Sequence, residues 1–340
     1  MPAPHTQMAK LNMKDIDIYG LGAGLVDTEI EVSDADLDNL QVEKGLMTLV
    51  DEKRQTELLT LLADHMVASK RACGGSATNT IIAAQYFGAQ TYYSCKVAND
   101  DNGAFYLNDI RAAGVGHPDQ MGKTDGITGK CLVLITPDAE RTMNTFLGVS
   151  ETLSTKELDE AAIQRSRYVY IEGYLVTSAT GKPAAIELKR LAEQHNCQTA
   201  LSLSDPGIVS FFHDGLKEMI GSGVDILFCN EDEALQYTQT EQFDDAYETL
   251  KQSAKTFAIT RGALGSVVFD GNSRHDVPSD KVKAVDTNGA GDMFAGAFLY
   301  CLSKGLDYAT AAQFANRAAA KVVSQFGPRL RPEQYTELSN

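Results

Sequence analysis

The sequence lacks the features that mark several classes of protein. It has no dense basic run, and its 30 Lys and Arg against 46 Asp and Glu give a formal net charge of −16, which argues against nucleic-acid binding. Its six cysteines form no CxxC pair and its six histidines show no HxxxH or HExxH spacing, so neither a zinc knuckle nor a redox pair is expected. No apolar run reaches the roughly 18 residues of a membrane span.

The start of the chain lacks a targeting pattern. Residues 1–13 are expected to form a frayed tail, and they lack the basic start and apolar core of a signal peptide. A disulfide framework is not expected at this length and cysteine density. The reducing cytoplasm is therefore the predicted location.

The 340 residues predict one large α/β domain with a small domain appended. Strands and helices alternate regularly after residue 150, which is typical of a mostly parallel sheet covered by helices. The predicted strands span 16–22, 91–97, 168–171, 198–203, 226–229, 256–259 and 266–269. The predicted helices span 52–67, 78–87, 103–113, 181–195, 210–221, 231–238, 244–253, 290–303 and 307–324. Hairpin-like pieces near 28–50 and 124–147 do not fit this sheet and predict a small second sheet, acting as a lid.

Two glycine-containing runs imitate nucleotide-binding motifs. The run GLGAG at 20–24 follows a strand, but the dinucleotide fingerprint requires a third glycine where Leu25 stands. The run GKT at 122–124 resembles the end of a P-loop, but His117 replaces the first glycine of that motif. Both runs are predicted to be plain turns, and a dehydrogenase is disfavoured.

The run DTNGAGD at 286–292 leads directly into an apolar helical pattern. Small residues at a helix start leave backbone N–H groups open, and these groups bind anions together with the positive end of the helix dipole. Asp292 in that first turn is suited to accept a hydroxyl proton, while the amides of Gly289, Ala290 and Gly291 stabilise a transferring phosphoryl group. The plain alternative is that Asp292 only stabilises the helix N-terminus.

Three further motifs accompany this run. GGSATN at 74–79 is another glycine turn that opens a helix, and its Asn79 can hydrogen-bond a polyhydroxylated ligand. NEDE at 230–233 follows a predicted strand at its carboxyl end, where parallel sheets bind ligands; it is suited to Mg²⁺-bound water, or else is an acidic helix start. Thr260, Gly262 and Gly265 follow the next strand, as a nucleotide-contacting loop or as a simple turn.

Together the four motifs resemble the ribokinase-like (PfkB) carbohydrate kinase family, and within it the adenosine kinases and their bacterial sugar- and nucleoside-kinase relatives. The resemblance runs from residue 16 to about 327, with the motifs in family order. It implies an α/β fold with a mostly parallel central sheet and a small β-sheet lid. The large domain would comprise 14–27, 73–122 and 149–340, and the lid 28–72 and 123–148.

The resemblance also assigns roles to residues. Asp292 would be the base, and Gly289, Ala290 and Gly291 the anion hole. The acceptor would be bound by Asp27, Gly75, Ser76 and Asn79. ATP and Mg²⁺ would be bound by Asn230, Glu233 (which would bind the metal through water), Thr260, Gly262, Gly265, Asn288 and Asn316. Some relatives bind a monovalent cation such as K⁺ near Asp286, which this sequence allows without requiring it.

Three positions bear on the acceptor. Met47 stands where adenosine kinases have a lid glutamine that helps to read the purine, and Tyr174 corresponds to the aromatic residue that stacks on the base. Arg141, on the second lid piece, would reach a phosphate in the closed state; its alternative is a solvated lid-strand arginine. The ribose contacts are therefore better matched than the purine contacts.

The leading hypothesis is an ATP-dependent kinase that phosphorylates a primary hydroxyl of a ribose-containing acceptor, first of all adenosine. A sugar kinase of the ribokinase or fructokinase type is the alternative within the class. A non-catalytic nucleoside- or sugar-binding protein on the same fold is the alternative outside it. Either a monomer or a homodimer is compatible, the latter through an exposed face of the lid sheet.

Overall fold

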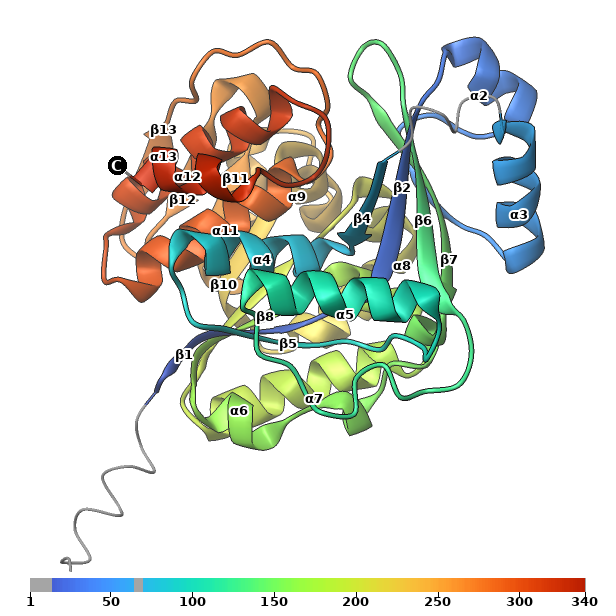
Figure 1. Ribbon diagram of the computed structural model, residues 1–340. Helices are drawn as coiled ribbons and strands as arrows, with labels where there is room; N and C mark the ends of the chain where they lie inside the picture. Colours follow the sequence, from blue (N-terminus) through green and yellow to red (C-terminus); the bar gives the residue numbers. More distant parts are fainter. Residues whose placement is uncertain (1–13, 64–69, 340) are drawn as a thin grey trace, which may run out of the picture.

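The computed structural model describes residues 14–63 and 70–339 (Figure 1). The tail predicted for 1–13 and the end of the helix predicted to reach residue 67 lie outside the described residues. No helix in these two ranges is long and apolar enough to cross a membrane.

The large sheet has eight strands in the order β13-β12-β11-β10-β9-β8-β1-β5. All neighbouring pairs are parallel except β11–β12 and β12–β13, which confirms the predicted mostly parallel sheet. The strands are β1 (Ile16–Leu21), β5 (Thr91–Ser94), β8 (Ser166–Glu172), β9 (Gln198–Ser202), β10 (Val224–Asn230), β11 (Ala254–Thr260), β12 (Ser266–Phe269) and β13 (Arg274–Val277).

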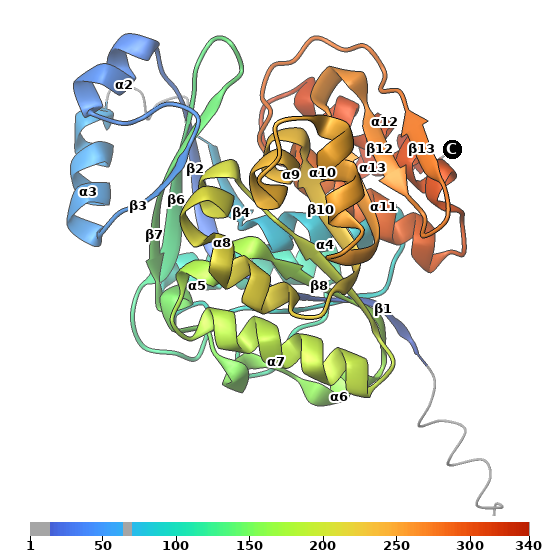
Figure 2. The ribbon, with the colours of Figure 1, turned by 180° about the vertical axis from the view of Figure 1, so that it is seen from behind.

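Helices cover both faces of this sheet because its central strands are apolar on both sides. In β10, Ile226 and Phe228 belong to one buried cluster, and Leu227 and Cys229 belong to the other. The first face carries α4 (Ser76–Phe87), α5 (Asp101–Ala113), α11 (Ala290–Ser303), α12 (Tyr308–Val323) and α13 (Pro332–Ser339). The second face, turned toward the viewer in Figure 2, carries α6 (Glu160–Gln164), α7 (Gly181–Gln194), α8 (Pro206–Ile220), α9 (Glu231–Thr238) and α10 (Phe243–Leu250).

The small sheet has five strands in the order β3-β7-β6-β2-β4. They are β3 (Met47–Leu49), β7 (Arg141–Gly148), β6 (Thr128–Ile135), β2 (Leu25–Glu31) and β4 (Lys70–Gly74). Two helices, α2 (Asp34–Leu40) and α3 (Glu52–Leu61), pack on its outer face, where Leu37, Leu40 and Leu58 meet Leu132 and Leu134. These helices cover that face of the small sheet (Figure 1), and the pairing of two subunits through the sheet stays a prediction.

Several boundaries differ from the predictions. The helix predicted for 210–221 begins at Pro206, because Asp205 caps it and proline fits the first helical turn. The strand predicted for 91–97 ends at Ser94. The strands β2 and β4 include Asp27 and Cys73 at the predicted domain border. The division into a large domain and a lid stays a prediction.

Candidate active site

A cavity of about 1410 Å³ lies between the small sheet and the carboxyl ends of the large sheet's strands. Glu172, Ser202, Asn230 and Thr260 end four successive parallel strands and all line the cavity, as expected for a parallel sheet. Every residue predicted for the site lines it except Asp286. The motifs are therefore brought together from distant parts of the chain.

The start of α11 forms an open anion site. Gly289 is its N-cap, with φ of 74° and no side-chain cap, and a Cβ there would lie 2.3 Å from the Pro328 carbonyl oxygen. The amides of Gly289 and Gly291 have no hydrogen-bond partner among the described residues, whereas the Ala290 amide donates to the Thr287 carbonyl over 3.3 Å. A Cβ at Gly291 would meet nothing within 4 Å. Open amides at a helix N-terminus are suited to an anion.

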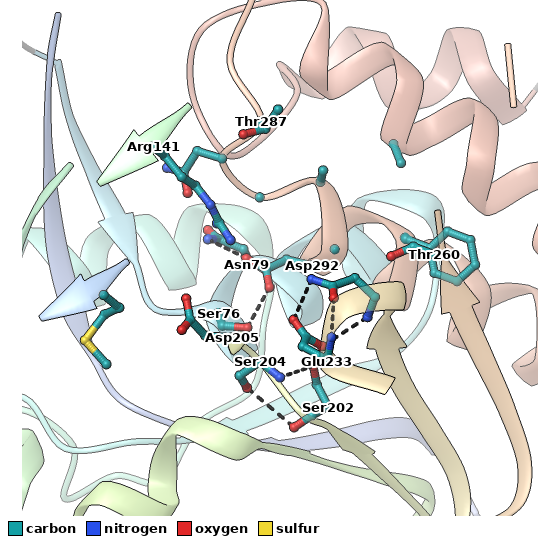
Figure 3. Close-up of a pocket in the computed structure, with 18 of the residues that line it drawn as sticks. Ser76, Asn79, Arg141, Ser202, Ser204, Asp205, Glu233, Thr260, Thr287 and Asp292 are labelled. Atoms are coloured by element: carbon teal, nitrogen blue, oxygen red, sulfur yellow. Dashed lines mark hydrogen bonds between the residues drawn. The ribbon is translucent and has the colours of Figure 1, made fainter. Parts of the chain in front are cut away.

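Asp292 makes its hydrogen bonds to another helix. The Ser76 hydroxyl donates to Oδ1 over 2.6 Å, and the Asn79 amide donates to Oδ2 over 3.2 Å (Figure 3). Both donors lie in the first turn of α4, which starts after Gly75 with φ of 94° and also lacks a side-chain cap. Burial raises the pKa of Asp292, and these two donors oppose the shift. Asp292 thus makes no cap hydrogen bond to its own helix.

Two hydrogen-bond-accepting groups near Asp292, the Asp27 carboxylate and Asn79 Oδ1, have no donor among the described residues. Asp27 is 5% exposed and has no hydrogen-bond partner among the described residues, and its pKa is raised well above the ordinary value by burial, then by Glu29. The neighbouring strand approaches so closely that a Cβ at Gly74 would lie 2.0 Å from the Asp27 carboxyl carbon. Asn79 Oδ1 is also buried without a partner. Both groups are therefore available to accept hydrogen bonds from hydroxyl groups.

Arg141 points from the start of β7 into the cavity (Figure 3). Burial alone would lower its pKa, but Tyr174, Asp292, Asp205 and Glu233 raise it. Its guanidinium forms no ion pair within the described chain. The arginine is therefore directed at the cavity, as the predicted contact with a phosphate requires.

At the carboxyl end of β10, Asn230 and Glu233 form the cap of α9. The Asn230 side chain accepts from the Glu233 amide over 2.8 Å, while the Asn230 amide and side chain donate to Glu233 over 3.0 and 2.8 Å. Burial raises the pKa of Glu233 to about 7. Both carboxylate oxygens are engaged, which suits contact with Mg²⁺ through water more than direct ligation. Within the described chain, no group of three or more His, Cys, Asp or Glu is placed to hold a metal.

The remaining predicted nucleotide contacts line the same end of the cavity. Thr260 ends β11, and Gly262 and Gly265 adopt positive φ values of 54° and 96° in the following turn. Arg261 holds this turn through a bidentate ion pair with Glu231. Asn316 donates to the Val277 carbonyl over 3.0 Å, so its amide is partly committed to the fold.

Asp286 lies behind the cavity wall and is fully buried. Its carboxylate accepts from the amides of Asn288 over 2.8 Å and Gly327 over 2.9 Å. Asn288 in turn donates to Glu29 over 3.2 Å. Asp286 therefore fixes the loop that leads into α11, and a monovalent cation beside it stays a prediction.

Three residues in or beside the cavity were not singled out by the sequence. Glu172 accepts from the amides of Ala23 over 2.6 Å and Ala77 over 2.8 Å, and burial raises its pKa to about 7. Thr287 donates to the Ala139 carbonyl at the tip of the β6–β7 hairpin over 3.1 Å. Asp205 lines the cavity as the cap of α8. The Asp-Pro pair was a recognisable cap signal, whereas the contacts of Glu172 and Thr287 join residues far apart in sequence.

Comparisons with known proteins agree with this geometry. The family model described as pfkB family carbohydrate kinase matches residues 56–334. The chain belongs to this family. It is therefore a phosphotransferase with an alcohol group as acceptor.

This kinase is similar to the adenosine kinases of the family. It is 31% identical over 333 residues to adenosine kinase of Saccharomyces cerevisiae, covering 92% of this chain and 96% of the relative. A crystal structure of adenosine kinase from Sinorhizobium meliloti matches with a TM-score of 0.89 at 33% identity, covering 96% of this chain and 100% of the other. A probable sugar kinase from Rhizobium etli matches with the same TM-score at 32% identity, covering 96% and 99%.

Proposed function

We propose that this kinase transfers the γ-phosphoryl group of ATP to the primary hydroxyl of a ribose-containing acceptor, with adenosine as the first candidate. The observation that carries the proposal is the position of Asp292, whose carboxylate lies in the first turn of α11 beside the open amides of Gly289 and Gly291. One group that takes a proton and others that stabilise developing negative charge thus occupy a single site.

In the proposed reaction, Asp292 accepts the proton of the acceptor's CH₂OH group as its oxygen attacks the γ-phosphorus and ADP leaves. The amides of Gly289 and Gly291 and the guanidinium of Arg141 stabilise the charge on the phosphoryl oxygens. Mg²⁺, when bound, neutralises charge on the ATP phosphates, and Glu233 is suited to hold its water ligands. Asp27 and Asn79 hold the sugar hydroxyls, which keeps the attacking oxygen in place.

The shape of the acceptor half favours a nucleoside over a free sugar. The inner face of the small sheet is an apolar wall, and Tyr174 adds an aromatic ring to the same cavity. A purine covers such a wall, whereas ribose or fructose would leave it in contact with water. The residues of the wall are Leu25, Met47, Cys131, Met143 and Leu147.

The most direct screen is ATP consumption in the presence of Mg²⁺ and a panel of acceptors. We expect adenosine to stimulate ADP formation more than ribose or fructose does. Stimulation by free sugars alone would contradict the nucleoside assignment and favour a sugar kinase. A protein that binds nucleosides but consumes no ATP with any acceptor would contradict catalysis altogether.

We further propose a cytoplasmic monomer. All six cysteines are present as buried free thiols, which suits a reducing compartment. The outer face of the small sheet is covered by α2 and α3 of the same chain, so pairing two lids would require these helices to move. Analytical ultracentrifugation would detect a homodimer if another surface forms one.

A further inference from the structure

Asp205 is a further buried carboxylate that lines the cavity near Tyr174, Arg141 and Glu233, and the reaction proposed above does not use it. It stands between β9 and α8 and is 3% exposed. Asp205 and Arg141 are directed into the cavity from opposite sides (Figure 3). A buried carboxylate aimed at a ligand cavity is costly unless a donor reaches it.

The backbone beside Asp205 is strained. Ser204 adopts φ of 76°, a left-handed conformation that is uncommon for a residue other than glycine. It is held there because the Gly173 amide donates to its hydroxyl over 2.8 Å and the Tyr174 hydroxyl donates to its carbonyl over 3.4 Å. One local structure therefore fixes both the Tyr174 ring and the Asp205 carboxylate.

Only one of the two carboxylate oxygens of Asp205 is engaged. Oδ1 accepts from the amides of Gly207 over 2.7 Å and Ile208 over 3.4 Å, and so caps α8. Oδ2 has no hydrogen-bond partner in the described part of the chain. A cap requires a single side-chain oxygen, and asparagine or serine serves equally well. The second oxygen of Asp205 is therefore not explained by the helix.

The walls around Asp205 offer few donors. Met47 and Met143 face the cavity from the small sheet without polar hydrogens. Lys44 lines the mouth of the cavity but is committed to Asp34 and Asp138, each over 2.7 Å. The ligand itself is thus the natural source of a donor, with Arg141 as the competing source.

We infer that Asp205 recognises the exocyclic amino group on the base of the acceptor nucleoside and thereby selects a 6-amino purine over a 6-oxo purine. The inference rests on the proposed nucleoside kinase function. An exocyclic amine donates to the free carboxylate oxygen beside the stacking ring. A carbonyl in the place of the amine would put two acceptors together, which disfavours the 6-oxo base in this position.

The test compares adenosine with inosine, which has the same ribose, in the wild type and in Asp205→Asn. The variant keeps the cap of α8 and the side-chain volume but replaces the free acceptor with an amide donor. We expect the wild type to prefer adenosine and the ratio of kcat/KM for adenosine to that for inosine to fall about tenfold or more. The KM for ATP should stay within about twofold, because the change is on the acceptor side.

Asp307→Asn provides a matched control. Asp307 caps α12 through the Thr310 amide over 2.9 Å, is exposed and does not line the cavity, so its variant should leave the ratio unchanged. An unchanged ratio in Asp205→Asn overturns the inference. A large rise in the KM for ATP alone also overturns it, because it would show that Asp205 acts by pairing with Arg141 and not by binding the base. A wild type that phosphorylates both nucleosides equally overturns only the inference. A wild type that phosphorylates only free sugars overturns the proposed function with it.

Discussion

The helix starts at α9 and α11 look alike in sequence but use their acids differently. α9 directly follows β10, whereas α11 follows a loop, and both begin at the cavity with an acid at the third helical position, Glu233 in one and Asp292 in the other. Glu233 folds back onto its own N-cap, Asn230. Asp292 has only Gly289 as N-cap and is held instead by Ser76 and Asn79 of α4. An acid at a helix start therefore suggests proton transfer most strongly when its own helix does not use it.

The largest effect is expected for Asp292→Asn. Loss of the base should lower kcat by about a thousandfold, within the range for general-base catalysis, and leave acceptor binding within a few-fold. Stability should not fall, because burial raises the pKa of Asp292, so the ionised carboxylate is costly in the folded state. Steady-state kinetics would measure kcat, calorimetry would measure acceptor binding, and thermal unfolding would measure stability. Near-normal turnover would contradict the assignment of Asp292 as the base and with it the contrast between α9 and α11.

Asp27→Asn should have the next largest effect. Loss of an acceptor of two hydroxyls is expected to raise the acceptor KM by about 10- to 100-fold, with a smaller change in the KM for ATP. The folded-state pKa of Asp27 lies well above that of the unfolded chain, so its unfavourable contribution grows as pH rises through this interval. The variant should therefore gain stability relative to the wild type at neutral pH. A variant with weaker ATP binding and normal acceptor binding would contradict the assignment.

Glu233→Gln should act on the nucleotide side. We expect the KM for MgATP to rise roughly tenfold with little change in acceptor binding, since a charged contact to metal-bound water is lost. The pKa of Glu233 is about 7 in the folded protein against 4.5 for an ordinary glutamate, so its contribution to stability falls as pH rises between these values. Unfolding measured from pH 4.5 to 8 should show a weaker decline in the variant than in the wild type. A fall in kcat as large as that of Asp292→Asn would contradict the different roles given to Glu233 and Asp292.

The smallest effect is expected for Thr287→Val. The variant removes the hydrogen bond between the loop before α11 and the Ala139 carbonyl at the tip of the hairpin that carries Arg141. We expect kcat/KM to fall a few-fold, since one neutral hydrogen bond is lost. Thr287→Ser keeps the hydroxyl and should restore activity. Equal losses in both variants would show that the methyl group matters and not the hydrogen bond.

Much of the site could be predicted because its motifs combine strand ends with glycine turns. Parallel strands bring their carboxyl ends to one edge, so residues such as Asn230 and Thr260 were placed together by topology alone. Positive φ at Gly75 and Gly289 is likewise a local requirement that the sequence displays.

Other features depend on contacts that no local pattern displays. Asp286 stabilises the loop before α11 by accepting a hydrogen bond from the amide of Gly327, which lies far along the chain. Helix α2 lies within 28–50, where only hairpin-like pieces were expected, although Ser33 and Asp36 form a capping box at its start. Asp205 was missed because the helix after it was expected to begin later, which left its cap and its free oxygen outside any predicted element.

The central claim is that the cavity transfers a phosphoryl group to a ribose hydroxyl. Its most direct test is the identification of products after incubating the protein with ATP, Mg²⁺ and adenosine, by mass spectrometry and phosphorus NMR. The account predicts ADP and adenosine 5′-monophosphate in equal amounts, with the phosphate on the CH₂ oxygen. Formation of ADP and inorganic phosphate without any phosphorylated nucleoside would contradict it.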